Sequence, residues 1–505
     1  MSEEVKDIQS TEKKNDTSSY RSIFKATSLF GGVEVYNILI HIIRSKFIAV
    51  LLGPFGIGVQ GLYQSALDLI RQVTSLGLSQ SAVRDIAEAH GTGDIKRISR
   101  SVTVLRRIVW YTGLLGMIAV IAFSPLLSKA SFGNNDHIIP FVFLSVILLL
   151  TQLSAGQKVV LQGMRRLKDL AKASSIGITV SLLITLPLYY ILGVSGIVPA
   201  MILMAMVTLL ISWFYSRKIK IDKQQLSTKE VFSDGKSMMI MGVSMSLSGV
   251  FSIGAAYLIR GMIRKWGGID EVGLYQAGFV IVNTYVGLIF NAISTDYYPR
   301  LAAINNDNNK CREVVSKQGE ISVLILAPIL SIGIVLMPLV IQILYSDKFV
   351  PADHFIKWAF LGMMFKLASW LVSYIFIAKA ESKLFIINEL AGNATNLALS
   401  LIGYKIAGLT GLGIAFAASF FVYFWQVYII AHIRYKFRFS KEFISSFILQ
   451  LVLVSIILVS IITLKGFIKY IIGSAFAVIS IAIAWKGLND KIELMSFVKT
   501  KLFKK

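Results

Sequence analysis

The amino-acid sequence predicts an all-α polytopic membrane protein with about 14 transmembrane helices, arranged as two pseudo-symmetric six-helix lobes plus a C-terminal helix pair. The first observation is composition: 55% of the 505 residues are hydrophobic and 16% are charged, whereas a soluble chain carries about a quarter charged residues. The second is a series of apolar runs, each long enough to cross a hydrocarbon core of roughly 30 Å. The third is a pair of motifs that recur at nearly one offset.

Fourteen segments have the length and hydropathy of membrane-spanning helices. Short loops with glycine or proline separate many of them, as at Gly53-Pro54 and between Gly193 and Gly196. The segments cover residues 23–51, 58–83, 102–127, 138–160, 172–192, 197–215, 237–262, 273–297, 321–345, 353–378, 383–404, 409–432, 443–464 and 467–486.

Lysine and arginine divide the loops into two sets. Every second loop holds several of them, for example Lys96, Arg97 and Arg100, while the loops on the opposite side hold few. Because cytoplasmic loops are enriched in lysine and arginine, both termini are predicted to be cytoplasmic. The net charge of +23 then reflects membrane topology, and no nucleic-acid partner is expected.

The repeated motifs predict an internal duplication. Gly61-Leu62-Tyr63-Gln64 recurs 212 positions later, and the turn at Gly193 is matched 215 positions later at Gly408. Such a tetrapeptide also suits the interfacial start of any membrane helix, but that explanation does not predict two matched offsets. Six-helix repeats keep one orientation and are related by an axis along the membrane normal. We predict a polar cytoplasmic tail (1–21), a first lobe (22–217), a cytoplasmic linker (218–236), a second lobe (237–434), and two last helices with a basic tail (435–505).

Polar side chains follow one face of several predicted helices at helical spacing. An ionisable group inside a span costs roughly 2.5–3.5 kcal/mol, so these groups should face the bundle interior or a wet cavity. The striped helices include matching members of both lobes, which favours a substrate cavity between the lobes. Its candidate binding residues are Arg44, Asp68, Arg71, Arg260, Asn283, Arg300, Lys366, Glu389 and Asn393.

The deep charged residues have a slight cationic surplus, which suits a phosphorylated or otherwise anionic cargo. Other interpretations stay open for single residues. Asp68 and Arg71 are three positions apart and can neutralise each other. Arg44 and Arg260 can extend toward headgroups, and membrane asparagines commonly pack helices together.

No enzyme chemistry is indicated. The sequence has one cysteine, Cys311, and it lacks a paired-histidine metal motif, a glycine-rich phosphate loop and a nucleophile elbow. No catalytic residue, metal or cofactor is therefore predicted, apart from a coupling proton or sodium ion. The candidates for carrying that ion are Glu34, His41, Asp68 and Glu389.

Several short segments together resemble the O-antigen and enterobacterial-common-antigen flippases of the Wzx type. Lys366, Glu389 and Arg300 are the charged positions that match this family's pattern. The resemblance covers most of the chain and is weak in four of the predicted helices, at residues 172–192, 197–215, 443–464 and 467–486. The segments are Gly53-Pro54-x-Gly56-x-Gly58, Asp270 to Gln276, Tyr298-Pro299-Arg300-Leu301, Tyr345 to Phe349, Trp358, Lys366, Ile377 to Ala380, and Glu389.

The resemblance implies a MATE-like fold with a central cavity and alternating access between the two membrane faces. It implies an undecaprenyl-diphosphate-linked oligosaccharide as cargo, moved from the cytoplasmic to the periplasmic leaflet of the bacterial inner membrane. Membrane lipid and the polysaccharide polymerase and chain-length machinery are the partners it suggests.

Two alternative functions stay open. A drug-cation antiporter could use the same fold, but a cationic cargo prefers an acidic cavity. A membrane glycan polymerase or ligase is disfavoured because the predicted loops are short.

Overall fold

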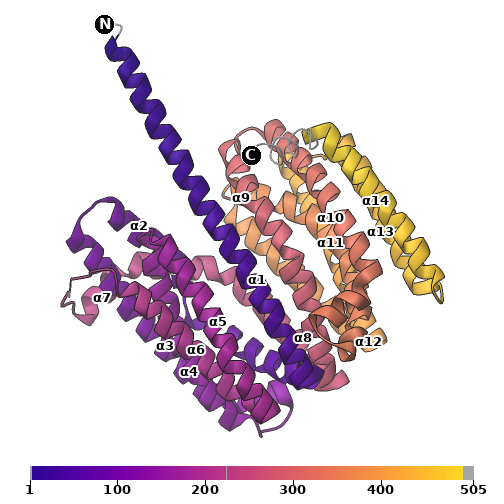
Figure 1. The fold of residues 1–505 in the computed structure, drawn as a ribbon, viewed down its shortest axis with the longest axis horizontal. Coiled ribbons are helices and arrows are strands. Elements are labelled where there is room, and N and C mark those ends of the chain that lie inside the picture. Colours follow the sequence, from indigo (N-terminus) through magenta and orange to yellow (C-terminus); the bar gives the residue numbers. More distant parts are fainter. Residues whose placement is uncertain (1–2, 223, 493–505) are drawn as a thin grey trace. The chain divides into compact units, whose positions relative to one another are not determined.

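The computed structural model describes residues 3–222 and 224–492, and all of their regular secondary structure is helical (Figure 1). The all-α prediction is confirmed for this part of the chain. The helices are α1 (Glu3–Thr74), α2 (Leu78–Gly91), α3 (Ile95–Phe132), α4 (Ile138–Gly163), α5 (Leu167–Leu192), α6 (Ile197–Ser216), α7 (Thr228–Asp234), α8 (Lys236–Val280), α9 (Gly287–Ala303), α10 (Asn308–Leu344), α11 (Asp353–Ala378), α12 (Ser382–Tyr435), α13 (Lys441–Thr463) and α14 (Ile468–Ile492). Three short helices, η1 (Gly193–Gly196), η2 (Ile281–Tyr285) and η3 (Asp347–Ala352), connect some of them.

Ten helical stretches in the described residues are long and apolar enough to cross a membrane. Four of the ten contain a break in helical geometry: Gly53 in α1, η1 between α5 and α6, Gly268 in α8, and Gly408 in α12. If each break is a turn at a membrane face, the ten stretches correspond to the predicted fourteen passes.

The break in α12 is a hairpin turn. Asn396 Nδ2 donates a hydrogen bond of 2.9 Å to Ser419 Oγ, and the Tyr423 hydroxyl donates one of 2.5 Å to Glu389 Oε1. The second pair lies further from Gly408 than the first on both sides of the turn. The two halves of α12 therefore run antiparallel. Gly408 has a φ of 53°, which glycine adopts without the steric cost of a side chain.

The described chain forms two compact units. The first contains the residues up to 52 and 66–250, and the second contains 53–65 and the residues from 251 onward. These borders differ from the predicted lobes, which assigned 53–65 to the first lobe and 237–250 to the second. The duplication itself stays a prediction.

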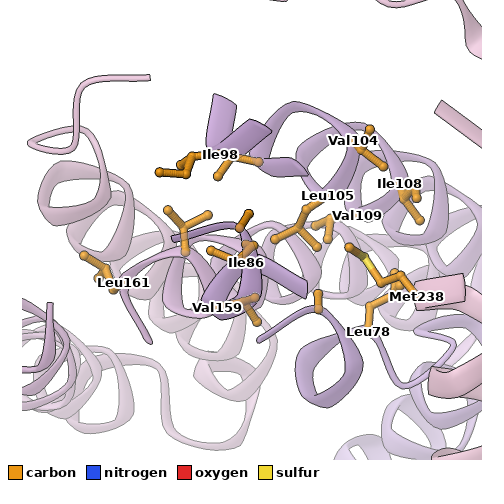
Figure 2. Close-up of a cluster of buried hydrophobic side chains, with 14 of the residues drawn as sticks. Leu78, Ile86, Ile98, Val104, Leu105, Ile108, Val109, Val159, Leu161 and Met238 are labelled. Carbon is orange, nitrogen blue, oxygen red and sulfur yellow. The ribbon is translucent and has the colours of Figure 1, made fainter. Parts of the chain in front are cut away.

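In the first unit, α2, α3 and α4 share a buried apolar core, which Met238 of α8 also enters (Figure 2). The linker packs into the same core. Val231 of α7 and Met238 of α8 join Leu105 and Ile108 of α3 in one buried apolar cluster. This burial explains why the linker and the start of α8 belong to the first unit. Ser227 caps α7, and its hydrogen bonds with Glu230 hold the pKa of that carboxyl below its usual value.

In the second unit, α11 is the central helix, with 67% of its apolar window buried. Helices α13 and α14 lie side by side next to α10 (Figure 1). A buried polar pair joins α13 and α14. Ser480 Oγ donates a hydrogen bond of 2.6 Å to Gln450 Oε1, and Gln450 Nε2 donates one of 3.3 Å to the Ser480 carbonyl. Because each polar group satisfies the other, this pair fixes the register of the two last helices.

The repeated glycine motifs meet within the second unit. A methyl group on Gly58 would overlap the carbonyl oxygen of Ile269, and one on Gly273 would overlap that of Pro54. A Cβ on Gly61 would lie 3.5 Å from Cγ of Gln276. Helix starts that cross at glycines bring their backbones into direct contact. The segment 53–65 therefore packs with the second unit because these glycines leave room for α8.

We expect Gly273→Leu to destabilise the protein, because its side chain must displace the backbone at Pro54. Overpacking of this kind costs about 1–3 kcal/mol or more. Gly287→Ala is the matched control, since a methyl group there has no neighbour within 4 Å. Thermal unfolding of both variants in detergent checks the prediction, and equal melting temperatures would contradict it.

Candidate functional site: a polar cavity in the second unit

A cavity of about 360 Å³ lies among α8, η2, α11 and α12 of the second unit. Aromatic rings cover part of its wall, including Phe279, Trp370, Phe416 and Phe420. Polar side chains cover the rest: Ser252, Asn283, Lys366, Ser369, Ser373, Glu389, Asn393, Asn396, Ser400, Ser419 and Tyr423. The sequence predicted four of these, Asn283, Lys366, Glu389 and Asn393, as cavity residues, and the fold brings all four together.

Lys366 places a cation in the cavity from the middle of α11. Its Nζ donates a hydrogen bond of 2.8 Å to Asn283 Oδ1. It also lies 5.3 Å from the ring centre of Phe420 and 5.8 Å from that of Phe290, within the range of cation–π attraction. Asn283 is carried by the π-helix η2, a type of irregular turn that is frequent at functional sites.

Glu389 supplies the carboxylate of the cavity, and Tyr423 from the other half of the α12 hairpin holds it. Its Oε1 accepts the 2.5 Å hydrogen bond from Tyr423. Asn393 Nδ2 donates hydrogen bonds of 2.8 Å to the Glu389 backbone carbonyl and of 3.1 Å to Ser252 Oγ. Among the ion pairs of the described residues, none joins Glu389 to Lys366. Lys366 and Glu389 thus place one positive and one negative charge in the same cavity.

Arg260 lies behind the aromatic wall and is only 7% exposed. Its Nε donates a hydrogen bond of 2.9 Å to Gln276 Oε1, and its guanidinium lies 5.4 Å from the ring centre of Phe279. It is not among the residues that line the cavity. Arg260 is thus held against the ring that forms the wall, and its predicted place in a binding site stays a prediction.

Arg300 also lies away from this cavity. It is exposed near the end of α9, and its Nη2 donates a hydrogen bond of 2.7 Å to Gln318 Oε1 of α10. Its predicted place in a binding site stays a prediction.

The other predicted residues belong to the first unit. Arg71 and Asp68 form an ion pair of 2.9 Å, as the spacing of three residues allowed. Arg44 has a buried Nε without a hydrogen-bond partner, and His41 lies one turn before it on α1. The side chain of Glu34 lies outside the described residues. The roles of these five residues in binding or ion coupling stay predictions.

Tyr423 and the aromatic wall were not predicted. These residues are aromatic members of apolar runs, and aromatic side chains are ordinary components of a membrane helix. One signal could have found Tyr423. A hairpin turn at Gly408 brings together residues at similar distances on either side. Tyr423 lies 15 residues after the turn and Glu389 lies 19 before it, a difference of about one helical turn.

The fold and this cavity define a polytopic membrane protein with a polar site inside a helix bundle. Residues 47–353, more than half of the chain, match the family model described as polysaccharide biosynthesis protein. The chain belongs to this family, and the resemblance drawn from the sequence is confirmed. Residues 271–481 also match the model described as lipid II flippase MurJ.

Among curated proteins, the chain is similar to the lipid III flippase of Escherichia coli (strain K12), with 22% identity over 80% of this chain and 96% of that protein. Among solved structures, it is similar to the lipid II flippase MurJ in an inward closed conformation. That match has a TM-score of 0.72 and 14% identity, covering 92% of this chain and 99% of the other. An inward-facing multidrug resistance MATE family transporter gives a TM-score of 0.66 and 15% identity. That match covers 79% of this chain and 94% of the transporter. The MATE-like fold is thus confirmed.

We expect Tyr423→Phe to lower the free energy of unfolding, because Glu389 loses its hydrogen-bond donor. A hydrogen bond to a charged group contributes about 1.5–3 kcal/mol. Tyr428→Phe on the same helix is the control, since its hydroxyl makes no hydrogen bond in the described structure. A double-mutant cycle with Glu389→Gln, followed by denaturant unfolding in detergent, measures the coupling. A coupling energy of zero would show that the two side chains do not interact.

Proposed function

We propose that this protein is a flippase that moves an undecaprenyl-diphosphate-linked oligosaccharide, an O-antigen or similar surface polysaccharide unit, from the inner to the outer leaflet by alternating access. The observation that carries the proposal is the polar cavity around Lys366 in a membrane protein of the polysaccharide biosynthesis family. The names of the similar proteins, lipid III flippase and lipid II flippase, support the same class of cargo.

The cavity offers three kinds of contact that such a cargo needs. Lys366 can make a charge-assisted hydrogen bond to a phosphate oxygen. The amides of Asn283, Asn393 and Asn396 can bind sugar hydroxyls, and Trp370 offers an aromatic surface for a sugar ring. At about 360 Å³ the cavity is at the small end of ligand sites. It would therefore hold part of the head group, while the polyprenyl tail stays in lipid.

Coupling to a proton or a sodium ion is a further part of the proposal. Glu389 is the one predicted ion carrier that lines the cavity. A proton on Glu389 would remove the charge that faces Lys366 across the cavity and would change the balance available to an anionic cargo. Glu34, His41 and Asp68 stay alternative carriers.

The proposed location is the bacterial inner membrane, with both termini in the cytoplasm, because lysine and arginine concentrate in alternate loops. Polysaccharide polymerase and chain-length machinery are proposed partners, since a translocated unit must next be joined into a chain.

Export of drug cations is the second candidate, because a multidrug MATE transporter shares the fold. Among the described residues that line it, the cavity holds one cation, Lys366, and one carboxylate, Glu389, so it lacks the net negative charge that a cationic cargo prefers. An enzymatic role is not part of the proposal: the similar proteins with printed functions are flippases and transporters.

We expect Lys366→Gln to slow transport of a lipid-diphosphate oligosaccharide by about ten- to hundredfold, because one charge-assisted hydrogen bond contributes about 1.5–3 kcal/mol. Proteoliposomes and a membrane-impermeant glycan-modifying reagent measure how fast cargo becomes accessible. Lys317→Gln is the control, since Lys317 is exposed and pairs with Glu313 on α10. Equal rates for wild type and Lys366→Gln would remove Lys366 from the site. Chains lengthened instead of moved by the wild type would favour a polymerase.

If Glu389 carries the coupling proton, Glu389→Gln should abolish the response of transport to an imposed pH gradient, while transport down a cargo gradient continues. The same proteoliposomes, with and without the gradient, provide the measurement. An unchanged gradient response would assign coupling to another residue, and a response to sodium alone would identify the other ion.

A further inference from the structure

A second large pocket, of about 840 Å³, lies in the first unit between α3 and the linker that follows α6. Five residues of α3 line it: Thr103, Arg106, Arg107, Trp110 and Tyr111. Their spacing of i, i+3, i+4, i+7 and i+8 places all five on one helix face. The linker forms the opposite wall, with residues 221, 222 and 224–227. Neither the proposed transport nor the cavity at Lys366 uses this pocket.

The two arginines have different tasks in this pocket. Arg107 donates a hydrogen bond to the Leu226 carbonyl and so ties the linker to α3. Arg106 is half-buried, and its Nε is buried without a hydrogen-bond partner. Among the ion pairs of the described residues, none includes either arginine. Arg106 thus lines the pocket without an ion-pair partner among the described residues.

The charge of the pocket favours an anion. Its one carboxylate among the lining residues is Asp222, whose backbone N–H is tied to Ser99 Oγ at 3.1 Å. Two arginines against one aspartate leave a surplus of one positive charge. A planar guanidinium presents a fork of donors that matches the oxygens of a phosphate group.

The depth of the pocket matches a lipid headgroup. The apolar run of α3 begins at Ile108, directly after Arg106 and Arg107, and extends to Leu127. Tryptophan and tyrosine prefer the headgroup level, and Tyr111 is stacked on Phe232 at 5.8 Å, which fixes its ring. Trp110 is 47% exposed. Arg106 lies one helical turn, about 5.4 Å, further from the hydrocarbon.

We propose that this pocket binds the phosphate of an anionic phospholipid headgroup, with Arg106 as its phosphate ligand and Trp110 against the glycerol region. The proposal concerns the membrane face that the sequence predicts as cytoplasmic, where basic pockets between helices take anionic headgroups. A lipid bound there would contact both α3 and the linker. Its headgroup would add to the hydrogen bond of Arg107 in holding the linker on α3.

The test uses the full chain in detergent, titrated with a short-chain phosphatidylglycerol and followed by tryptophan fluorescence. We expect a saturable change in wild type that is absent in Trp110→Phe. The apparent Kd should rise at least tenfold in Arg106→Gln and stay unchanged in Arg97→Gln, an exposed arginine of α3 that pairs with Glu88. A saturable change of equal strength with phosphatidylcholine, or no effect of Arg106→Gln, would overturn the proposal.

Inorganic diphosphate identifies the source of the phosphate. We expect it to compete with phosphatidylglycerol only weakly, because it lacks the glycerol and acyl groups that contact Trp110. Competition at equal strength would overturn the lipid assignment and point to the diphosphate of a cargo. Should Arg106→Gln fail to fold, Arg106→Lys keeps the charge without the guanidinium fork and is expected to bind several-fold more weakly. Unchanged binding in Arg106→Lys would show that the guanidinium donors of Arg106 do not bind the phosphate. None of these outcomes depends on whether transport occurs.

Discussion

Inside a lipid bilayer, a polar group finds no water and must be satisfied by the protein. This constraint explains the arrangement of the second unit. Lys366 is bound by Asn283, Glu389 by Tyr423, and Asn393 by Ser252 and the Glu389 carbonyl. Apart from the Glu389 carbonyl, which lies one turn before Asn393 in α12, each partner comes from another helix or from the other half of the α12 hairpin. The polar groups therefore hold α8, η2, α11 and α12 around a cavity, and the same contacts that satisfy them keep the cavity polar.

Close helix contact is the second element of the architecture, and it depends on glycine. Gly58 and Gly273 let segment 53–65 and α8 touch through their backbones, and Gly403 and Gly411 do the same inside the α12 hairpin. Van der Waals packing at such points replaces the hydrophobic driving force, which is absent between helices in lipid. The polar cavity lies among helices that these contacts bring together.

The sequence predicted the helices and part of the site for one reason: hydropathy and helical phase are local properties. Asn283, Lys366, Glu389 and Asn393 stood out because each interrupts an apolar run. Tyr423 and Phe420 were not predicted, because aromatic residues in such a run have no distinguishing pattern until the hairpin partner is known. The unit borders were also not predicted, since hydropathy does not reveal that Met238 enters the core of α2 to α4. Arg260 was named a cavity residue from helical phase; it lies behind the wall of this cavity, and its role in binding stays a prediction.

The π-helix η2 between α8 and α9 changes the helical phase of everything that follows it. A π-turn adds one residue to a helical turn, which rotates the later residues by about 100° relative to a continuous α-helix. The side of α9 that faces its neighbours is therefore not fixed by the side of α8 that faces the cavity. The cavity is lined by Tyr275, Phe279 and Asn283, while α9 presents other residues to α10 and α11. Loss of a single residue from 281–285 would bring the two helices into one phase and turn the whole surface of α9 at once. This five-residue segment thus makes the chain far more sensitive to a one-residue deletion than to most substitutions at the same positions.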